Sequence, residues 1–159
     1  MSRPGASAGG FTLVEVLIAM VLMGIMMAIA LPPLRSSQEW RVVHSAADEF
    51  AARHSMARAA AVRRGRLAEL HIDAGTGRLW VEVDTSAARA GVMDTLGPVL
   101  DVADQFGVTV TSTRSRFCFD VRGLATQTSG CPPGDATVVF SRGSYADTVR
   151  TSVVGKVLR

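Results

Sequence analysis

The chain has 159 residues, of which 48% are hydrophobic and 19% are charged, a length that suits one compact domain with an additional segment. The formal net charge is only +3, so charge alone does not indicate a nucleic-acid-binding protein. The sequence has no phosphate-binding loop, dinucleotide fingerprint, HExxH or GxSxG motif, and we expect no enzyme activity.

The first element is an apolar segment, residues 11–31, in which Glu15 carries the only strongly polar side chain. As an α-helix this segment would be about 30 Å long, which matches the hydrocarbon layer of a bilayer. A secretory signal peptide is the alternative, but the segment is too long for a signal-peptide core and no small-residue cleavage site follows it. We therefore expect a membrane-spanning helix.

Two features distinguish this segment from an ordinary membrane anchor. Glu15 places a carboxylate where it costs about 2.5–3.5 kcal/mol at mid-depth, so an intramembrane acid indicates a function. The alternative for Glu15 is a side chain that reaches the nearby interface. The second feature is the preceding segment, residues 1–10, which is short and polar and ends in Gly9-Gly10.

Residues 10–15, GFTLVE, resemble the prepilin cleavage and methylation motif of type IV pilins and type II secretion pseudopilins. The resemblance implies that prepilin peptidase cleaves between Gly10 and Phe11 and that the new terminus at Phe11 is N-methylated. It also implies a helix-bending role for Pro32. In a filament, the Glu15 carboxylate would lie near the terminal amine of a neighbouring subunit, and each charge would offset the cost of burying the other.

The same resemblance implies a location in the bacterial inner membrane, with the N-terminus in the cytoplasm and the C-terminal domain in the periplasm, before assembly into a filament. The flanking charges do not indicate this orientation, because Arg3 precedes the apolar segment whereas Arg35 and Arg41 follow it. The implied partners are prepilin peptidase, other pilin or pseudopilin subunits, the inner-membrane assembly platform and the membrane.

A second helical segment follows the prolines Pro32-Pro33, which predict a kink or a brief break. Its apolar or weakly polar residues recur at steps of three and four up to Gly65, where the helix is expected to end. These residues are Trp40, Val43, Ala47, Phe50, His54, Ala57 and Ala61. We expect this stripe to pack on a sheet, and a coiled-coil seam is the alternative.

The three histidines are His44, His54 and His71, and each lacks a second ligand at a spacing typical of metal sites. We interpret His54, which lies on the apolar stripe, as a core or boundary residue. The sequence therefore predicts neither a metal site nor a cofactor.

After Gly65 the hydrophobic period changes to two, which is typical of strands. Residues 68–73 and 79–83 alternate on either side of the turn AGTG and predict a hairpin, whereas residues 84–105 predict a loop with some local structure. Further strands are expected at Val108–Thr111, Arg116–Val121, Thr137–Ser141, Thr148–Val153 and Lys156–Leu158. The predicted fold class is α+β and pilin-like: a long N-terminal helix packed on a C-terminal antiparallel β domain.

The chain is thus expected to have four regions, which are a leader (1–10), a transmembrane or assembly helix (11–34), its amphipathic continuation (35–65) and a periplasmic β-rich domain (66–159). The domain contains both cysteines, Cys118 and Cys131. In an oxidising compartment we expect them to form a disulfide, which would stabilise the domain by about 3 kcal/mol. Two free buried thiols are the alternative.

Three later segments, residues 56–65, 119–125 and 149–157, resemble the helix end, an internal strand and turn, and the closing strands of the GspH/FimT family of minor pseudopilins. The resemblance implies a structural subunit that acts in filament initiation or at the tip. The filament would be the pseudopilus of a type II secretion system or a type IV pilus, and the motifs do not distinguish these two machines.

DNA binding is the alternative function, because some type IV pilus members of this family resemble DNA receptors of natural transformation. The corresponding candidate contacts here are Arg142, Arg150, Lys156 and Arg159. The last two depart from the family's ending, since residues three apart in a strand point to opposite faces.

Overall fold

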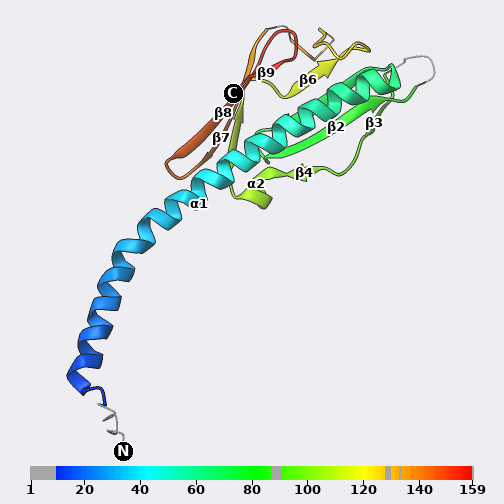
Figure 1. Ribbon diagram of the computed structural model, residues 1–159. Helices are drawn as coiled ribbons and strands as arrows, with labels where there is room; N and C mark the ends of the chain where they lie inside the picture. The colour runs from blue at the N-terminus through cyan, green and yellow to red at the C-terminus, as the bar shows by residue number, and fades with distance from the viewer. Residues whose placement is uncertain (1–9, 87–90, 128–129, 133, 159) are drawn as a thin grey trace, which may run out of the picture. The chain divides into compact units, whose positions relative to one another are not determined.

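The computed structural model describes residues 10–86, 91–127, 130–132 and 134–158, and of residues 31–36 it describes the backbone only. The chain divides into two compact units, Met1–Gln38 and Glu39–Arg159. Helix α1, Leu13–Arg64, contributes to both units (Figure 1). The long N-terminal helix followed by antiparallel sheets confirms the predicted α+β fold class.

Helix α1 begins at a cap that its own sequence provides. The backbone N–H of Glu15 donates to the Thr12 carbonyl at 3.1 Å and lies 3.3 Å from the Thr12 hydroxyl oxygen. Thr12 therefore satisfies a backbone donor that the first turn leaves without a helical partner. The acidic side chain of Glu15 lies in that same first turn, where the helix dipole favours negative charge.

The helix ends at Gly65, as predicted. Gly65 has a φ of +59°, which a residue with a Cβ atom adopts only with strain. Its N–H donates to the Val62 carbonyl at 3.3 Å, and the N–H of Arg66 donates to the Ala61 carbonyl at 3.1 Å. This pair of bonds is the Schellman arrangement that terminates many helices.

The backbone of α1 is helical through Pro32 and Pro33, so the expected alternative of a break at these prolines is wrong. A proline lacks the N–H that a helix interior uses, but its fixed φ is close to the helical value. The loss of hydrogen bonds therefore does not interrupt the helix. The kink expected at Pro32 stays a prediction.

A first antiparallel sheet, in the described part of the chain, has the strand order β3-β2-β1-β6, and β4 also pairs with β2. Its strands are β1 Ala68–Asp73, β2 Arg78–Asp84, β3 Met93–Thr95, β4 Leu100–Asp101 and β6 Arg116–Phe119. β1 and β2 form the predicted hairpin, with Leu70 opposite Val81. Side chains of even number in β1 and odd number in β2 face the core.

A second antiparallel sheet has the order β5-β7-β8-β9 among the described residues. Its strands are β5 Thr109–Ser112, β7 Ala136–Arg142, β8 Tyr145–Thr151 and β9 Val157–Leu158. These match the expected strands to within a few residues. The local structure expected in the loop over residues 84–105 consists of β3, β4 and most of the short helix α2, Val102–Phe106.

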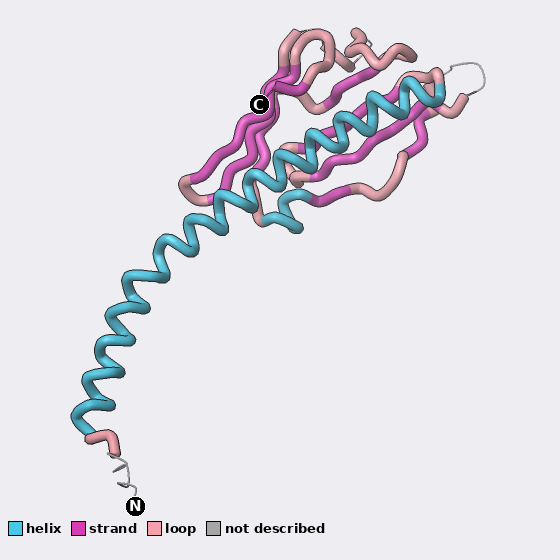
Figure 2. The backbone as a smooth tube through the Cα atoms, in the orientation of Figure 1, coloured by secondary structure: helices cyan, strands magenta, loops and turns pink. Residues whose placement is uncertain are grey.

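The C-terminal part of α1 lies along both sheets (Figure 2). Phe50 is fully buried, and its ring centroid is 5.7 Å from that of Phe117 in β6 and 6.0 Å from that of Phe140 in β7. One helical side chain thus contacts the first and the second sheet. The alanines of this face, Ala46, Ala47, Ala57, Ala60 and Ala61, are also buried, and their small size lets the helix approach the strands closely.

The predicted stripe of α1 is confirmed from Val43 to Ala61, but Trp40 does not belong to the core, because 54% of its surface is exposed. Trp40 stacks on His44 with the ring centroids 5.2 Å apart. Tyr145, Ala146 and Asp147 at the start of β8 lie near these two rings, so the end of the β7–β8 hairpin approaches the helix there.

A disulfide joins Cys118 in β6 to Cys131, with the two Cα atoms 6.0 Å apart, so the prediction of a pair is confirmed and the alternative of free thiols is wrong. The loop that the bond closes returns over the end of α1. A Cβ atom on Gly123 would lie 2.8 Å from Val62 Cγ2, so the close approach requires a glycine there. Backbone N–H groups of Leu124 and Arg122, with the Arg122 guanidinium, lower the pKa of Asp120 in this turn.

Candidate functional site

The apolar half of α1 exposes every side chain over its first 18 residues, Leu13–Ala30. The window Leu13–Ala30 has a mean hydropathy of 2.6, and none of its 18 residues is buried. Its large side chains range in exposure from 46% at Val16 to 78% at Leu13. Length and composition are those of a membrane-spanning helix, and a signal sequence near an N-terminus has the same properties. The adjoining residues bear on the choice between the two.

Those residues place a predicted cleavage point and a carboxylate at one end of the helix. Gly10 and Phe11 precede the first helical residue and are exposed, Phe11 by 83%. Glu15 is the only ionisable residue in the apolar window. If the chain is cut after Gly10, Phe11 becomes the terminal residue and carries an amine four positions before Glu15.

This arrangement combines the Glu15 carboxylate with the amine that cleavage would create on Phe11, at one end of an apolar helix. Each charge alone is unfavourable in a bilayer or among apolar helices, and a pair is far less so. A subunit with this end therefore gains from a partner that offers the opposite charge at the same depth. The structure gives the conformation and exposure of Gly10, Phe11 and Glu15. Their roles in cleavage, methylation and assembly stay predictions.

The four basic candidates for DNA contact do not form one surface in the described residues. In the β7–β8 hairpin, Arg142 is opposite Tyr145 and Arg150 is opposite Thr137. Thr137 and Arg142 are five residues apart, so the two arginines lie about 16 Å apart along the strands and on opposite faces of the sheet. Moreover, Arg142 Nη1 donates to the Phe106 carbonyl at 2.8 Å, which ties β7 to the end of α2.

Arg150 and Lys156 lie at the other end of that hairpin, and both are exposed. Arg150 is opposite Leu158 of β9, and the turn before β9 is held by the Ser152 N–H, which donates to the Lys156 carbonyl at 2.8 Å. Arg159 is outside the described residues. The structure thus brings together two of the four candidates and separates Arg142 from them.

His54 is a core residue, as expected. It is 2% exposed and packs edge-on against Phe119, with the ring centroids 4.9 Å apart. Burial, with a smaller contribution from the Arg58 charge, lowers the pKa of His54 to about 4. The imidazole is therefore neutral at physiological pH.

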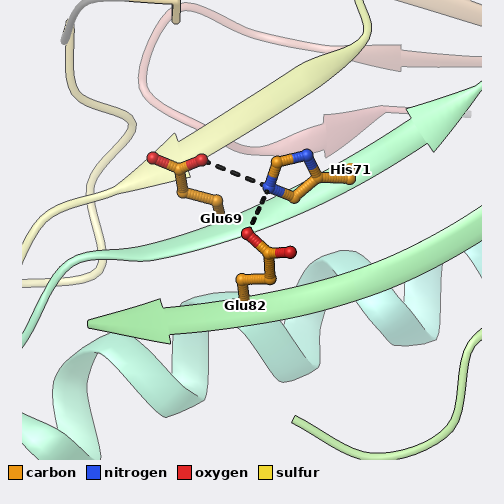
Figure 3. A group of neighbouring side chains, drawn as sticks. All are labelled: Glu69, His71 and Glu82. Atoms are coloured by element: carbon orange, nitrogen blue, oxygen red, sulfur yellow. Dashed lines mark ion pairs between the residues drawn. The ribbon is translucent and has the colours of Figure 1, made fainter. Parts of the chain in front are cut away.

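His71 is not isolated from other potential ligands, so that part of the sequence interpretation is wrong. Its Nε2 lies 3.2 Å from an oxygen of Glu69 and 3.1 Å from an oxygen of Glu82 (Figure 3). Two signals could have revealed the group: Glu69 and His71 are two apart in one strand, and the hairpin places Glu82 opposite Glu69. Only the register supplies the second signal.

Comparisons with known proteins agree with these features. A family model described as the prokaryotic N-terminal methylation motif matches residues 6–31. A second family model, described as type II transport protein GspH, matches residues 46–155, which is more than half of the chain. The chain belongs to the type II transport protein GspH family. No curated protein matches it.

Two solved structures share the fold of this GspH-family chain. Both are crystal structures of the type IV minor pilin FimU of Pseudomonas aeruginosa strain PAO1, at 20% identity. The first, in space group P21, matches with a TM-score of 0.56 over 73% of this chain and 86% of that one. The second, in space group P65, matches with a TM-score of 0.53 over 72% and 90%. The predicted pilin-like fold is confirmed.

Proposed function

We propose that this GspH-family chain is a minor subunit of a pilin-like filament, either the pseudopilus of a type II secretion system or a type IV pilus, and that it acts in filament initiation or at the tip. One observation carries the proposal. The first 18 residues of α1 are apolar, wholly exposed and interrupted only by Glu15, whereas the domain from Glu39 has its own core. The apolar half is thus available for partners outside the chain.

The proposed assembly proceeds in two steps. Prepilin peptidase first cleaves after Gly10, and Phe11 then carries a terminal amine, which is N-methylated. Glu15 next pairs with the amine of a neighbouring subunit as the apolar helices leave the bilayer and pack together. Because either charge alone is costly among apolar helices, the pair fixes the axial position of one subunit against the next.

The proposed location follows from the same end of the chain. Residues 1–10 act as the leader on the cytoplasmic side, residues 11–34 cross the inner membrane, residues 35–65 continue the helix, and residues 66–159 lie in the periplasm. The disulfide between Cys118 and Cys131 favours a compartment in which disulfides persist. The proposed partners are prepilin peptidase, other pilin or pseudopilin subunits and the inner-membrane assembly platform. FimU, which shares the fold, is itself a minor pilin.

The experiment compares the wild-type chain with two variants and a control variant, each produced in a strain that lacks the chromosomal copy. Wild-type chain should appear, shortened by ten residues, in the sheared filament fraction. Gly10→Leu should remain unprocessed and membrane-bound, because a bulky residue replaces the glycine at the cleavage point. Glu15→Leu should be membrane-inserted but largely absent from filaments, since it leaves the neighbour's amine without a partner.

Met20→Leu is the matched control, because Met20 lies in the same exposed apolar window and the change conserves volume. It should enter filaments as the wild-type chain does. Incorporation of Glu15→Leu at the level of Met20→Leu would contradict the proposed role of Glu15. Absence of wild-type chain from every filament fraction would contradict the subunit function itself.

DNA uptake is a second candidate function, favoured by the two exposed basic residues at the β8–β9 end, Arg150 and Lys156. Phosphate contacts at this end would give binding that weakens steeply with salt. We expect an Arg150→Ala/Lys156→Ala variant to lose duplex DNA binding in that case, whereas Arg142→Ala should not. Absence of binding by the wild-type chain at low salt would exclude this function.

A further inference from the structure

The first sheet carries a polar group on its outer face that the assembly function does not use. Glu69 and His71 project from β1 and Glu82 projects from β2, on the face away from the core residues Leu70 and Val81 (Figure 3). The side chains of Glu69 and His71 are 8% and 11% exposed, and that of Glu82 is 25% exposed. Two acids and an imidazole are therefore held together with limited access to water.

The two carboxylates need a cation between them. Glu69 and Glu82 are directly opposite each other on neighbouring antiparallel strands, an arrangement in which like charges destabilise a sheet. Burial of Glu69 increases the cost, because a desolvated carboxylate requires a compensating charge. On the described residues, the Arg116 guanidinium approaches Glu69 at 3.4 Å, and no arginine or lysine is paired with Glu82.

The imidazole offers its Nε2 atom to both acids at once. Nε2 lies 3.2 Å from Glu69 Oε2 and 3.1 Å from Glu82 Oε2, and the three ligand atoms are all within 4.8 Å of one another. His71 as a whole is only 9% exposed, and this nitrogen is buried. Yet the nitrogen has no hydrogen-bond partner of acceptable geometry within the described part of the chain. Such an orphaned buried nitrogen is unusual.

The two distances from His71 Nε2 suit a shared metal ion. Two ligand atoms that each lie about 2.1 Å from one ion are about 3.0 Å apart in octahedral and about 3.4 Å apart in tetrahedral coordination. The two distances from Nε2 fall in that interval. We propose that Glu69, His71 and Glu82 form a binding site for a divalent first-row metal ion of the Zn²⁺ type. The imidazole disfavours Ca²⁺ and Mg²⁺, which take oxygen ligands.

Neighbouring side chains orient the acids. Trp80 Nε1 donates to Glu82 Oε1 at 2.9 Å and leaves Oε2 turned toward His71, while the Trp80 ring stacks on the imidazole with centroids 4.9 Å apart. Such supporting bonds fix metal ligands in known sites. Arg116 approaches the same Glu69 oxygen that faces His71, so its charge opposes a metal ion. Removal of that charge should tighten metal binding.

His44 offers a matched comparison, because it also lies near two carboxylates. Its Nδ1 is 2.9 Å from Asp147 Oδ2, whereas its other nitrogen, Nε2, is 4.0 Å from Asp48 Oδ2. The acids thus approach opposite sides of the ring, and one ion cannot contact both acids and the imidazole. If the metal ion bound nonspecifically to exposed histidines, binding would depend on His44. Binding at Glu69, His71 and Glu82 would not.

The test uses the full chain in detergent, without a polyhistidine tag and with Trp40→Phe as background, so that Trp80 is the only tryptophan. Co²⁺ should quench Trp80 emission with one equivalent bound, and calorimetry should give the same stoichiometry for Zn²⁺. Loss of the imidazole in His71→Ala, or of the charge in Glu82→Gln, should weaken binding at least about tenfold. His44→Ala should not change it, and Arg116→Gln should tighten it.

Circular dichroism of each variant separates loss of binding from loss of fold, and Glu82→Gln preserves a carbonyl acceptor for Trp80 if His71→Ala proves unstable. Failure of the Trp40→Phe chain to bind Zn²⁺ or Co²⁺ stoichiometrically would overturn the proposal and leave a polar network of Glu69, His71 and Glu82 without a metal ion. Equal losses in His44→Ala and His71→Ala would overturn it as well. The outcome does not depend on filament assembly, so it is separable from the proposed function.

Discussion

The two halves of helix α1 are built for different surroundings. Within the first unit, the window Leu13–Ala30 is apolar apart from Glu15 and wholly exposed, whereas the half of α1 from Glu39 onward buries one face, centred on Phe50, and exposes Arg41, Asp48 and Arg58 on the other. A helix that is apolar all round needs a bilayer or other apolar helices, and an amphipathic one needs a single folded partner. The difference indicates that one half is completed by other molecules and the other half by its own chain.

The largest expected effect contrasts a truncation to alanine in each half of α1. Phe50→Ala should lower the free energy of unfolding of the domain by about 4 kcal/mol, because it removes a ring that contacts both sheets. Leu17→Ala, at a position 54% exposed, should leave it unchanged. Denaturant titration of the full chain in detergent, followed by near-UV circular dichroism, measures both. Similar losses in the two variants would contradict the division.

The disulfide should stabilise the domain from Glu39 onward and leave the apolar half of α1 unaffected. Cys118→Ala/Cys131→Ala should lower the free energy of unfolding by about 3 kcal/mol, since the bond closes a loop with a sequence separation of 13. Membrane insertion of α1 should be unaffected. The control is a reducing agent, which should destabilise the wild-type domain to the same degree and the double variant not at all. A fully stable double variant would exclude this contribution.

His54 should make the stability of the domain depend on pH. Because its pKa is about 4 in the folded state and about 6.5 when unfolded, the unfolded chain binds the proton first as pH falls. Stability should thus be complete above pH 6.5 and decline below it, by about 2 kcal/mol at pH 5. His54→Phe should flatten this slope.

Thermal unfolding between pH 7 and pH 4.5 is the suitable measurement for that prediction. Hydrogen bonds hold the pKa values of Asp73, Asp84, Asp101 and Asp120 below the usual range, so these groups affect stability only at lower pH. Arg58 is the charged neighbour that contributes to the His54 shift, and it keeps its charge throughout. An identical slope in His54→Phe would assign the pH dependence to other groups.

The smallest expected effect compares two glycines of the same helix. Gly65→Ala should destabilise the domain by about 1 kcal/mol, because a Cβ atom strains the φ of +59° that ends α1. Gly24→Ala lies in the apolar half, where a Cβ atom meets nothing within 4 Å, and should not change domain stability. Equal effects in denaturant titrations would show that helix termination at Gly65 does not matter.

Much of this fold could be predicted because its signals are local. The apolar segment, the stripe from Val43 to Ala61, the helix end at Gly65 and the β1–β2 hairpin each follow from a period or a turn in a short stretch of sequence. The family motif at residues 10–15 is local too. The paired cysteines required one further assumption, the oxidising compartment.

The remaining features depend on partners distant in the sequence. β3 and β4 have only three and two residues, and both exist because β2 offers them an edge, which no local pattern records. Trp40 continues the stripe in sequence but lies beyond the sheets that bury the rest of it. The group Glu69, His71 and Glu82 requires the register of the hairpin. The split of Arg142 from Arg150 likewise appears only when the sheet is in place.

The central claim is that Glu15 completes the apolar half of α1 inside a filament, and a competition within one cell tests it most directly. Wild-type chain and Glu15→Leu, distinguished by mass, would be produced together and quantified in the membrane and in the sheared filaments. We expect the ratio of wild-type to variant to be at least about tenfold higher in filaments than in the membrane, since an unpaired amine costs more than about 1.4 kcal/mol. Equal ratios in the two fractions would contradict the claim.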